Sequence, residues 1–188
     1  YWTIDRPKLG FITYYDWWLE QNTQGRHIWP GMYTSKIGDD RNAGEILRQM
    51  SVLRERGLKM TPGHFHWNFD SLHKDLGKIG TYTKERAYTT HAIPPASPWL
   101  SHSTLPAPVV GKTMPAGKLT VAWQHSDIRW MSQTRWWVMQ AQINGKWITW
   151  ETYFKDQLSD EWPDNATAVA IRAAGLGWEV GEAGVVVK

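Results

Sequence analysis

The amino-acid sequence predicts two parts, an α/β part over residues 1–105 and an all-β part over residues 106–188. Three observations predict this division. Strand-like and helix-like stretches alternate before residue 91, a proline-rich segment covers residues 93–108, and runs of alternating polarity follow it. Proline fixes φ and cannot donate a backbone hydrogen bond, so this segment favours an extended connector. We therefore expect a domain boundary near residue 105.

The best helix signal in the first part covers residues 42–57. Asn42 is a favourable N-cap residue, and Glu45, three residues on, completes a pattern resembling a capping box. Apolar residues then recur at helical spacing until Gly57, which suits a left-handed C-cap. Weaker patterns predict helices over residues 14–21 and 69–76.

Between these helices, two short apolar stretches over residues 25–35 and 58–65 predict strands. Strands and helices that alternate with short links are typical of βαβ units with a parallel sheet. A further strand over residues 1–4 would place Asp5 directly after its end. In parallel α/β folds, the loops that follow strands build the ligand site. We therefore expect functional side chains in those loops.

Beyond residue 108, polar and apolar residues alternate as they do in strands. Asn144-Gly145 lies between two such runs and predicts a type I′ hairpin, because both turn residues need positive φ. Trp136 and Trp137 point to opposite faces of one strand, so at least one of them should face outward. About seven short strands in some eighty residues predict a small β-sandwich. The expected strands include residues 119–124 (with Trp123 in the core), 136–143, 146–152, 169–173 and 185–187.

Composition excludes several classes of protein. The chain has no cysteine, which excludes disulfides, cysteine-ligated zinc and a catalytic thiol. It has no apolar run long enough for a membrane span and no phosphate-binding or serine-hydrolase motif. The net charge is +3 without a run of five basic residues, so nucleic-acid binding is a weak third hypothesis. We expect no cofactor.

Tryptophan and histidine supply the candidate ligand contacts. The sequence holds 14 tryptophans, whose flat faces either fill cores or stack on sugar rings and bases. Trp29 and Trp67 lie near predicted strand ends, where sugar stacking is plausible. His64 and His66 fall on the same side of an extended segment, with His73 a helical stretch later. A metal ligand, a contact to substrate hydroxyls and structural packing all remain open for these histidines.

Carboxylates do not form a recognisable catalytic pair. Hydrolysis of a glycosidic bond needs two of them, about 5–9.5 Å apart across the scissile bond. In the first part, most acidic residues belong to predicted helix starts or solvent-facing positions. Asp5 alone follows a possible strand, while Asp16 lies on a predicted helix.

Several ordered segments of the chain carry a resemblance. They are residues 27–35 (HIWPGMYTS), Glu45-Ile46 with Gln49 and Arg54, Gly63-His64-Phe65, and Pro98-Trp99-Leu100. In order and spacing, this set resembles the end of the catalytic barrel in the glycosyl-hydrolase-like family ten. Residues 108–110, 119–123 and 168–173 are similar to the fibronectin type III-like domain that commonly follows that barrel. The resemblance spans residues 10–188.

The resemblance implies a (β/α)₈ barrel, action on glycans and an extracytoplasmic bacterial setting, either secreted or at the cell surface. A complete barrel needs eight strands and about 250 residues. Residues 1–105 can supply its last two strands and at most the end of a third. We therefore expect the chain to be the C-terminal part of a larger hydrolase, with the catalytic acids upstream in a missing barrel portion.

Within that frame, five residues are expected to line a glycan cleft. Trp67 would stack on a sugar ring, His64 and His66 would hydrogen-bond sugar hydroxyls, and Tyr33, next to Ser35, would orient the substrate. The alternative hypothesis is a non-catalytic carbohydrate-binding or wall-attachment module. It rests on the tryptophan-rich sandwich and on the lack of a carboxylate pair.

Overall fold

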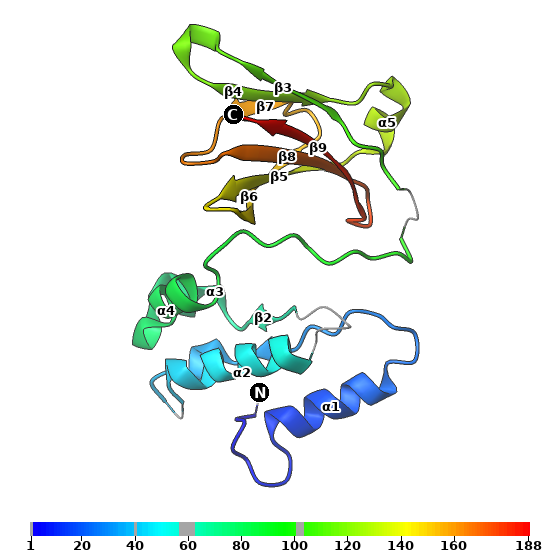
Figure 1. The fold of residues 1–188 in the computed structure, drawn as a ribbon. Helices are drawn as coiled ribbons and strands as arrows, with labels where there is room; N and C mark the ends of the chain where they lie inside the picture. The colour runs from blue at the N-terminus through cyan, green and yellow to red at the C-terminus, as the bar shows by residue number, and fades with distance from the viewer. Residues whose placement is uncertain (1, 40, 57–62, 101–103) are drawn as a thin grey trace. The chain divides into compact units, whose positions relative to one another are not determined.

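The computed structural model describes residues 2–39, 41–56, 63–100 and 104–188 (Figure 1). The chain divides into two compact units, Tyr1–Thr89 (unit 1) and Thr90–Lys188 (unit 2). The division lies 16 residues before the predicted boundary at residue 105. The proline-rich connector is therefore part of unit 2, where Leu105 is fully buried in the core.

Helices are the main regular secondary structure of unit 1. They are α1 (Phe11–Gln21), α2 (Ala43–Arg56), α3 (Phe69–His73) and α4 (Ile79–Arg86), with 3₁₀ turns at Thr34–Lys36 and Leu76–Lys78. The first three were predicted, although α1 begins earlier and α3 ends earlier than expected, and α4 was not predicted. Asn42 caps α2, because its Oδ1 accepts the Glu45 N–H at 3.0 Å. Gly57, the predicted C-cap residue, lies outside the described residues.

Two very short strands pair in parallel in unit 1. They are β1 (Gly31–Met32) and β2 (Phe65–His66), in register with Gly31 opposite Phe65. β1 lies inside the predicted strand 25–35, and β2 begins at the last residue of the predicted strand 58–65, of which residues 58–62 fall outside the described part. The predicted strand at residues 1–4 is wrong for the described Trp2–Ile4 stretch, which forms an irregular segment entering a turn at Ile4-Asp5. Strand-like composition there reflects packing of single side chains instead of sheet pairing.

The core of unit 1 lies where α2 packs on β1 and α1. Its buried apolar side chains come from every third or fourth residue of α2, as expected for an amphipathic helix. They are Ala43, Ile46, Met50 and Leu53 of α2, together with Phe11, Tyr15, Met32, Ile37 and Ile79.

Unit 2 is mostly antiparallel sheet. A three-stranded sheet has the order β3 (Val109–Thr113), β4 (Thr120–Gln124), β7 (Ser159–Glu161). A four-stranded sheet has the order β6 (Lys146–Phe154), β5 (Trp136–Ile143), β8 (Ala168–Ala174), β9 (Val180–Val187). The short helix α5 (Ile128–Gln133), which was not predicted, joins β4 to β5. The chain thus combines helices with antiparallel sheets, and its C-terminal region is mainly sheet.

Side chains of both sheets meet in one core. Val121 and Trp123 of β4 pack with Trp137 and Met139 of β5 and with Ile171 of β8. Trp123 is 2% exposed and Trp137 is fully buried, while the neighbouring Trp136 stays outside this core and is partly exposed. The predicted core position of Trp123 and the outward position of one of the paired tryptophans are confirmed.

The hairpin between β5 and β6 has the predicted turn. Asn144 and Gly145 have φ values of 51° and 75°, and Ile143 pairs with Lys146 across them. Both turn residues thus adopt the left-handed conformation of a type I′ turn. In the described ranges, no helix has the length and apolarity needed to cross a membrane.

Replacing Gly145 with alanine should lower the free energy of unfolding by about 1–2 kcal/mol, since a Cβ is strained at this positive φ. Gly111 in β3 is the matched control, because open space surrounds its Cβ position. Urea unfolding monitored by circular dichroism measures both variants. Equal stability of Gly145→Ala and Gly111→Ala would contradict the turn assignment.

Candidate functional site

Parallel pairing brings predicted site residues together at the carboxyl ends of β1 and β2. Tyr33 and Ser35 follow β1, and Trp67 follows β2. The Trp67 N–H donates to the Met32 carbonyl at 2.8 Å, and the Ser35 N–H donates to the Trp67 carbonyl at 2.8 Å. The indole of Trp67 is 59% exposed, so it offers a ring face to a ligand.

His64 and His66 converge on a third side chain, Tyr88. The Tyr88 Oη lies 2.5 Å from His64 Nε2 and 2.8 Å from His66 Nε2. The two imidazole rings are perpendicular, with centroids 5.1 Å apart. The predicted placement of both histidines on one side of the strand explains this convergence. Tyr88 was missed because it follows α4, which carries no strong sequence signal.

One assignment of protons satisfies every contact of this network. The Thr34 hydroxyl donates to the Met32 carbonyl at 3.3 Å and accepts from His66 Nδ1–H at 3.2 Å. His66 Nε2 then accepts the Tyr88 O–H, and His64 Nε2–H donates to the Tyr88 oxygen. Both imidazoles are neutral in this arrangement.

Burial favours the same neutral forms. The pKa of His64 falls to about 4, mainly because burial penalises the charged imidazole, with smaller effects of His66 and of the Arg54 guanidinium. Burial also lowers the pKa of His66 and raises the pKa of the Tyr88 phenol. At neutral pH the network therefore presents uncharged donors and acceptors, which suit neutral hydroxyl groups.

Tyr33 and Ser35 contribute differently from the histidines. The Arg41 guanidinium and the Lys36 ammonium lie 5.6 Å and 5.9 Å from the centroid of the Tyr33 ring. These are cation–π distances, so two cations already approach this ring. Ser35 contributes its backbone N–H to the bond with Trp67.

Trp29 does not join this group. It precedes β1, at the amino end of the strand, where its ring stacks on His27 with centroids 5.9 Å apart and lies 5.6 Å from the Phe65 ring. An alanine Cβ at Gly63 would collide with the Trp29 indole. Trp29 and Trp67 both lie near strand ends, as predicted, but Trp29 lies at the amino end of β1 and Trp67 at the carboxyl end of β2.

The acidic residues near the first residues of the chain have structural roles. Asp5 lies in a turn and accepts two hydrogen bonds from Arg48 at 2.8 and 2.9 Å, which lower its pKa. Glu45 is buried and accepts from the Ile4 N–H and from Gln49 Nε2, both at 2.8 Å. Across the described ranges, no group of three or more His, Cys, Asp or Glu side chains is placed to hold a metal ion.

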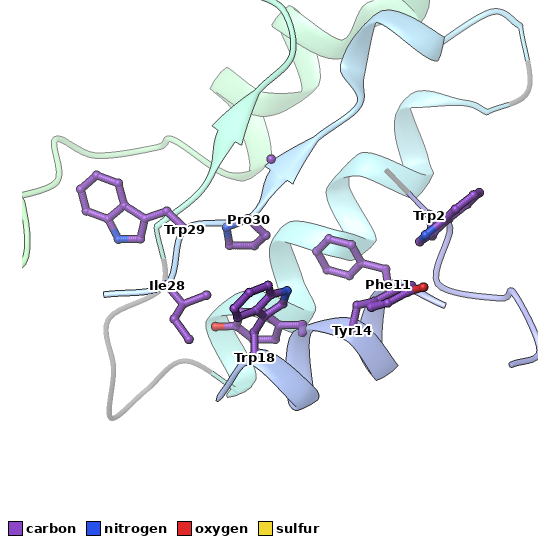
Figure 2. A pocket seen from close by; sticks show the side chains of 9 residues that line it. Trp2, Phe11, Tyr14, Trp18, Ile28, Trp29 and Pro30 are labelled. Atoms are coloured by element: carbon purple, nitrogen blue, oxygen red, sulfur yellow. The ribbon is translucent and has the colours of Figure 1, made fainter. Parts of the chain in front are cut away.

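A second feature of unit 1 is an aromatic pocket of about 430 Å³ (Figure 2). One wall is the face of α1 formed by residues 11, 14, 15 and 18, which recur at helical spacing. The opposite wall is the segment 28–31, and Trp2 closes one side. Because residues 28–30 precede β1, the pocket lies at the amino end of that strand. The aromatic spacing of α1 is the sequence signal for this pocket.

Comparison with protein-family models and with curated proteins finds no match for this chain. The roles of these residues must therefore be argued from their chemistry and geometry.

Acidification should destabilise unit 1 between about pH 6.5 and pH 4. The unfolded chain binds a proton on His64 in this window, whereas the folded chain does not, so stability is complete above it and falls as pH decreases. Thermal unfolding across this range should show a smaller pH dependence for His64→Asn than for the unchanged chain. His73→Asn, at an exposed position on α3, is the control. An unaltered slope in His64→Asn would contradict the network.

Proposed function

We propose that unit 1 forms part of the glycan-binding edge of a glycoside-hydrolase-like enzyme. The observation that carries this proposal is the strand-end site, defined here as Tyr33, Ser35, His64, His66, Trp67 and Tyr88. The Trp67 indole is exposed, and the nearby residues of the same chain segment, His64 and His66, form a network of neutral imidazole and phenol groups with Tyr88. The ordered resemblance to the end of a family-ten barrel is the second support.

The chemistry of this site suits a neutral sugar. The flat face of Trp67 can stack on the apolar C–H face of a pyranose ring. A sugar hydroxyl could replace the Tyr88 oxygen as the hydrogen-bond partner of one histidine. Both His64 and His66 would then remain hydrogen-bonded. Burial of a neutral hydroxyl costs little when such partners are present, whereas a charged ligand would need a counter-charge.

The short parallel ladder suits a larger sheet. Two strands of two residues each are too small for independent stability. We place β1 and β2 in a (β/α)₈-type sheet, with further strands completing the barrel and lying outside this unit. In this proposal unit 2 is a fibronectin type III-like sandwich, in keeping with its three-stranded and four-stranded sheets. An extracytoplasmic location belongs to the same proposal.

Catalytic carboxylates are assigned to that larger sheet. The strand-end site holds no Asp or Glu, and the two acids next to the first residues are engaged, Asp5 by Arg48 and Glu45 by Ile4 and Gln49. A hydrolase built on this site therefore takes its acid and its nucleophile or base from other strands.

Trp67→Ala should weaken binding of the chain to its polysaccharide at least tenfold, because a stacking face is lost. Affinity electrophoresis against cellulose derivatives, xylan, chitin derivatives and peptidoglycan glycan strands identifies the polymer and measures the change. Trp147→Ala is the control, since Trp147 is comparably exposed but lies on β6 of unit 2. Equal retardation of Trp67→Ala and the unchanged chain would remove Trp67 from the site.

A second candidate function is a non-catalytic carbohydrate-binding module in unit 2. The supporting observation is a stack of three aromatic rings outside the core. Trp136 lies 4.4 Å from Phe154 and 4.9 Å from Trp178 between ring centroids, and Phe154 is 68% exposed. Such a surface can hold a sugar ring without any catalytic group.

Phe154→Ala in the full chain separates the two functions. Loss of polysaccharide retardation in Phe154→Ala, with Trp67→Ala unaffected, would favour the binding module. Loss only in Trp67→Ala would favour the strand-end site. The same electrophoresis panel measures both, and far-ultraviolet circular dichroism checks that each variant is folded.

A further inference from the structure

The aromatic pocket at the amino end of β1 is built by an unusual helix face. Residues 11, 14, 15 and 18 of α1 are all aromatic and share one side of the helix. Phe11 and Tyr15 are buried in the core of unit 1, but Tyr14 and Trp18 are 38% and 56% exposed. The face is thus half packed and half open, and its open half is the pocket wall in Figure 2.

The lining of the pocket defines the charge of a ligand. The nine lining residues include no Asp, Glu, Lys, Arg or His. The nearby Arg6 guanidinium stacks on the Trp2 ring, 3.6 Å from its centroid, and is not part of the lining. An ion in this pocket would lose hydration without a counter-charge, so a neutral ligand is favoured.

The lining also defines the shape and polarity of a ligand. Six of the nine residues are aromatic, and five of these carry an N–H or O–H donor, with phenylalanine as the exception. A pure hydrocarbon has no acceptor for hydrogen bonds from such donors. A flat ring with hydroxyl groups at its edge uses both the ring faces and the donors. The volume of about 430 Å³ lies in the range of ligand sites.

From these features we infer that the pocket binds a neutral sugar ring, at a site separate from the strand-end site. Its segment 28–30 precedes β1, whereas Tyr33 and Trp67 of the strand-end site follow β1 and β2, and the two sites share no lining residue. The neutral, ring-shaped character of the ligand follows from the pocket alone. Its assignment to sugars rests on the proposed function.

The test uses the full chain and three neutral hexasaccharides, cellohexaose, chitohexaose and xylohexaose, measured by isothermal titration calorimetry. Trp18→Ala should weaken binding of the preferred hexasaccharide at least tenfold. Trp147→Ala is the matched control, because it removes an equally large, 44% exposed indole that lies on β6, outside the pocket lining. The affinity of this control variant for the preferred hexasaccharide should change less than twofold.

Gly63→Ala provides a second variant that substitutes none of the lining residues. The added methyl group would displace the Trp29 indole, so it should also weaken binding. Equal affinity of Trp18→Ala and Trp147→Ala would overturn the inference. So would the failure of all three hexasaccharides to bind. In that case, saturable binding of the neutral apolar dye N-phenyl-1-naphthylamine, lost in Trp18→Ala, would indicate a surface for apolar packing.

Trp67→Ala keeps the two proposals distinguishable. If Trp67→Ala alone weakens hexasaccharide binding, the inference about the pocket is overturned and the proposed function of the strand-end site stands. Weakening by Trp18→Ala alone would support the pocket and contradict the strand-end site. Weakening by both would support two sites, and the titration should then require more than one hexasaccharide per chain.

Discussion

Three backbone hydrogen bonds hold β1 beside β2: Phe65 N–H to the Pro30 carbonyl, Trp67 N–H to the Met32 carbonyl and Ser35 N–H to the Trp67 carbonyl. Because the strands are parallel and only two residues long, these bonds fix which side chains meet at each end. Tyr33, Ser35 and Trp67 follow the carboxyl ends of the two strands, His64 and His66 lie on one side of the β2 segment, and Trp29 and the pocket lie at the amino end of β1. A slip of one residue would exchange His66 and Phe65 between the two faces of the pair.

The N-terminal segment depends on a second constraint, the buried carboxylate of Glu45. It accepts hydrogen bonds from the Ile4 N–H and from Gln49, whose amide also donates to the Trp2 carbonyl at 3.1 Å. A buried carboxylate needs such donors, since its desolvation is otherwise costly. One acid on α2 thereby positions the segment that carries Trp2, one wall of the aromatic pocket.

Local signals made α2 and the β5–β6 hairpin predictable from sequence, because a cap at Asn42 and an Asn-Gly turn act within a few residues. The sequence predicts that the Glu45 side chain supports that cap. In the structure this side chain instead accepts hydrogen bonds from the Ile4 N–H and from Gln49 Nε2. Tyr88 could not be predicted as a site residue, because its contacts to His64 and His66 join residues more than 20 positions apart in the chain. It also follows a helix whose sequence shows only weak apolar periodicity. The sequence predicts Trp29 near a strand end but does not predict which end. A shift of two or three residues in the limits of a strand decides which end a side chain occupies.

The distribution of charge supports the proposal that the ligands are neutral and are not polyanions. The chain is basic overall, with a pI of about 9.1, yet several of its cations are paired: Arg48 with Asp5 at 2.8 Å, Arg56 with Asp16 at 2.6 Å and Lys118 with Glu161 at 2.7 Å. When protein cations bind a phosphate backbone, the counter-ions of that backbone are released, and this release favours binding. A protein cation that is already paired with a carboxylate contributes less to it. The aromatic pocket is lined without charge, and the histidines of the strand-end site are held neutral by burial. Exposed indole faces beside uncharged donors recognise shape and hydroxyl pattern, which is the information that a neutral glycan carries.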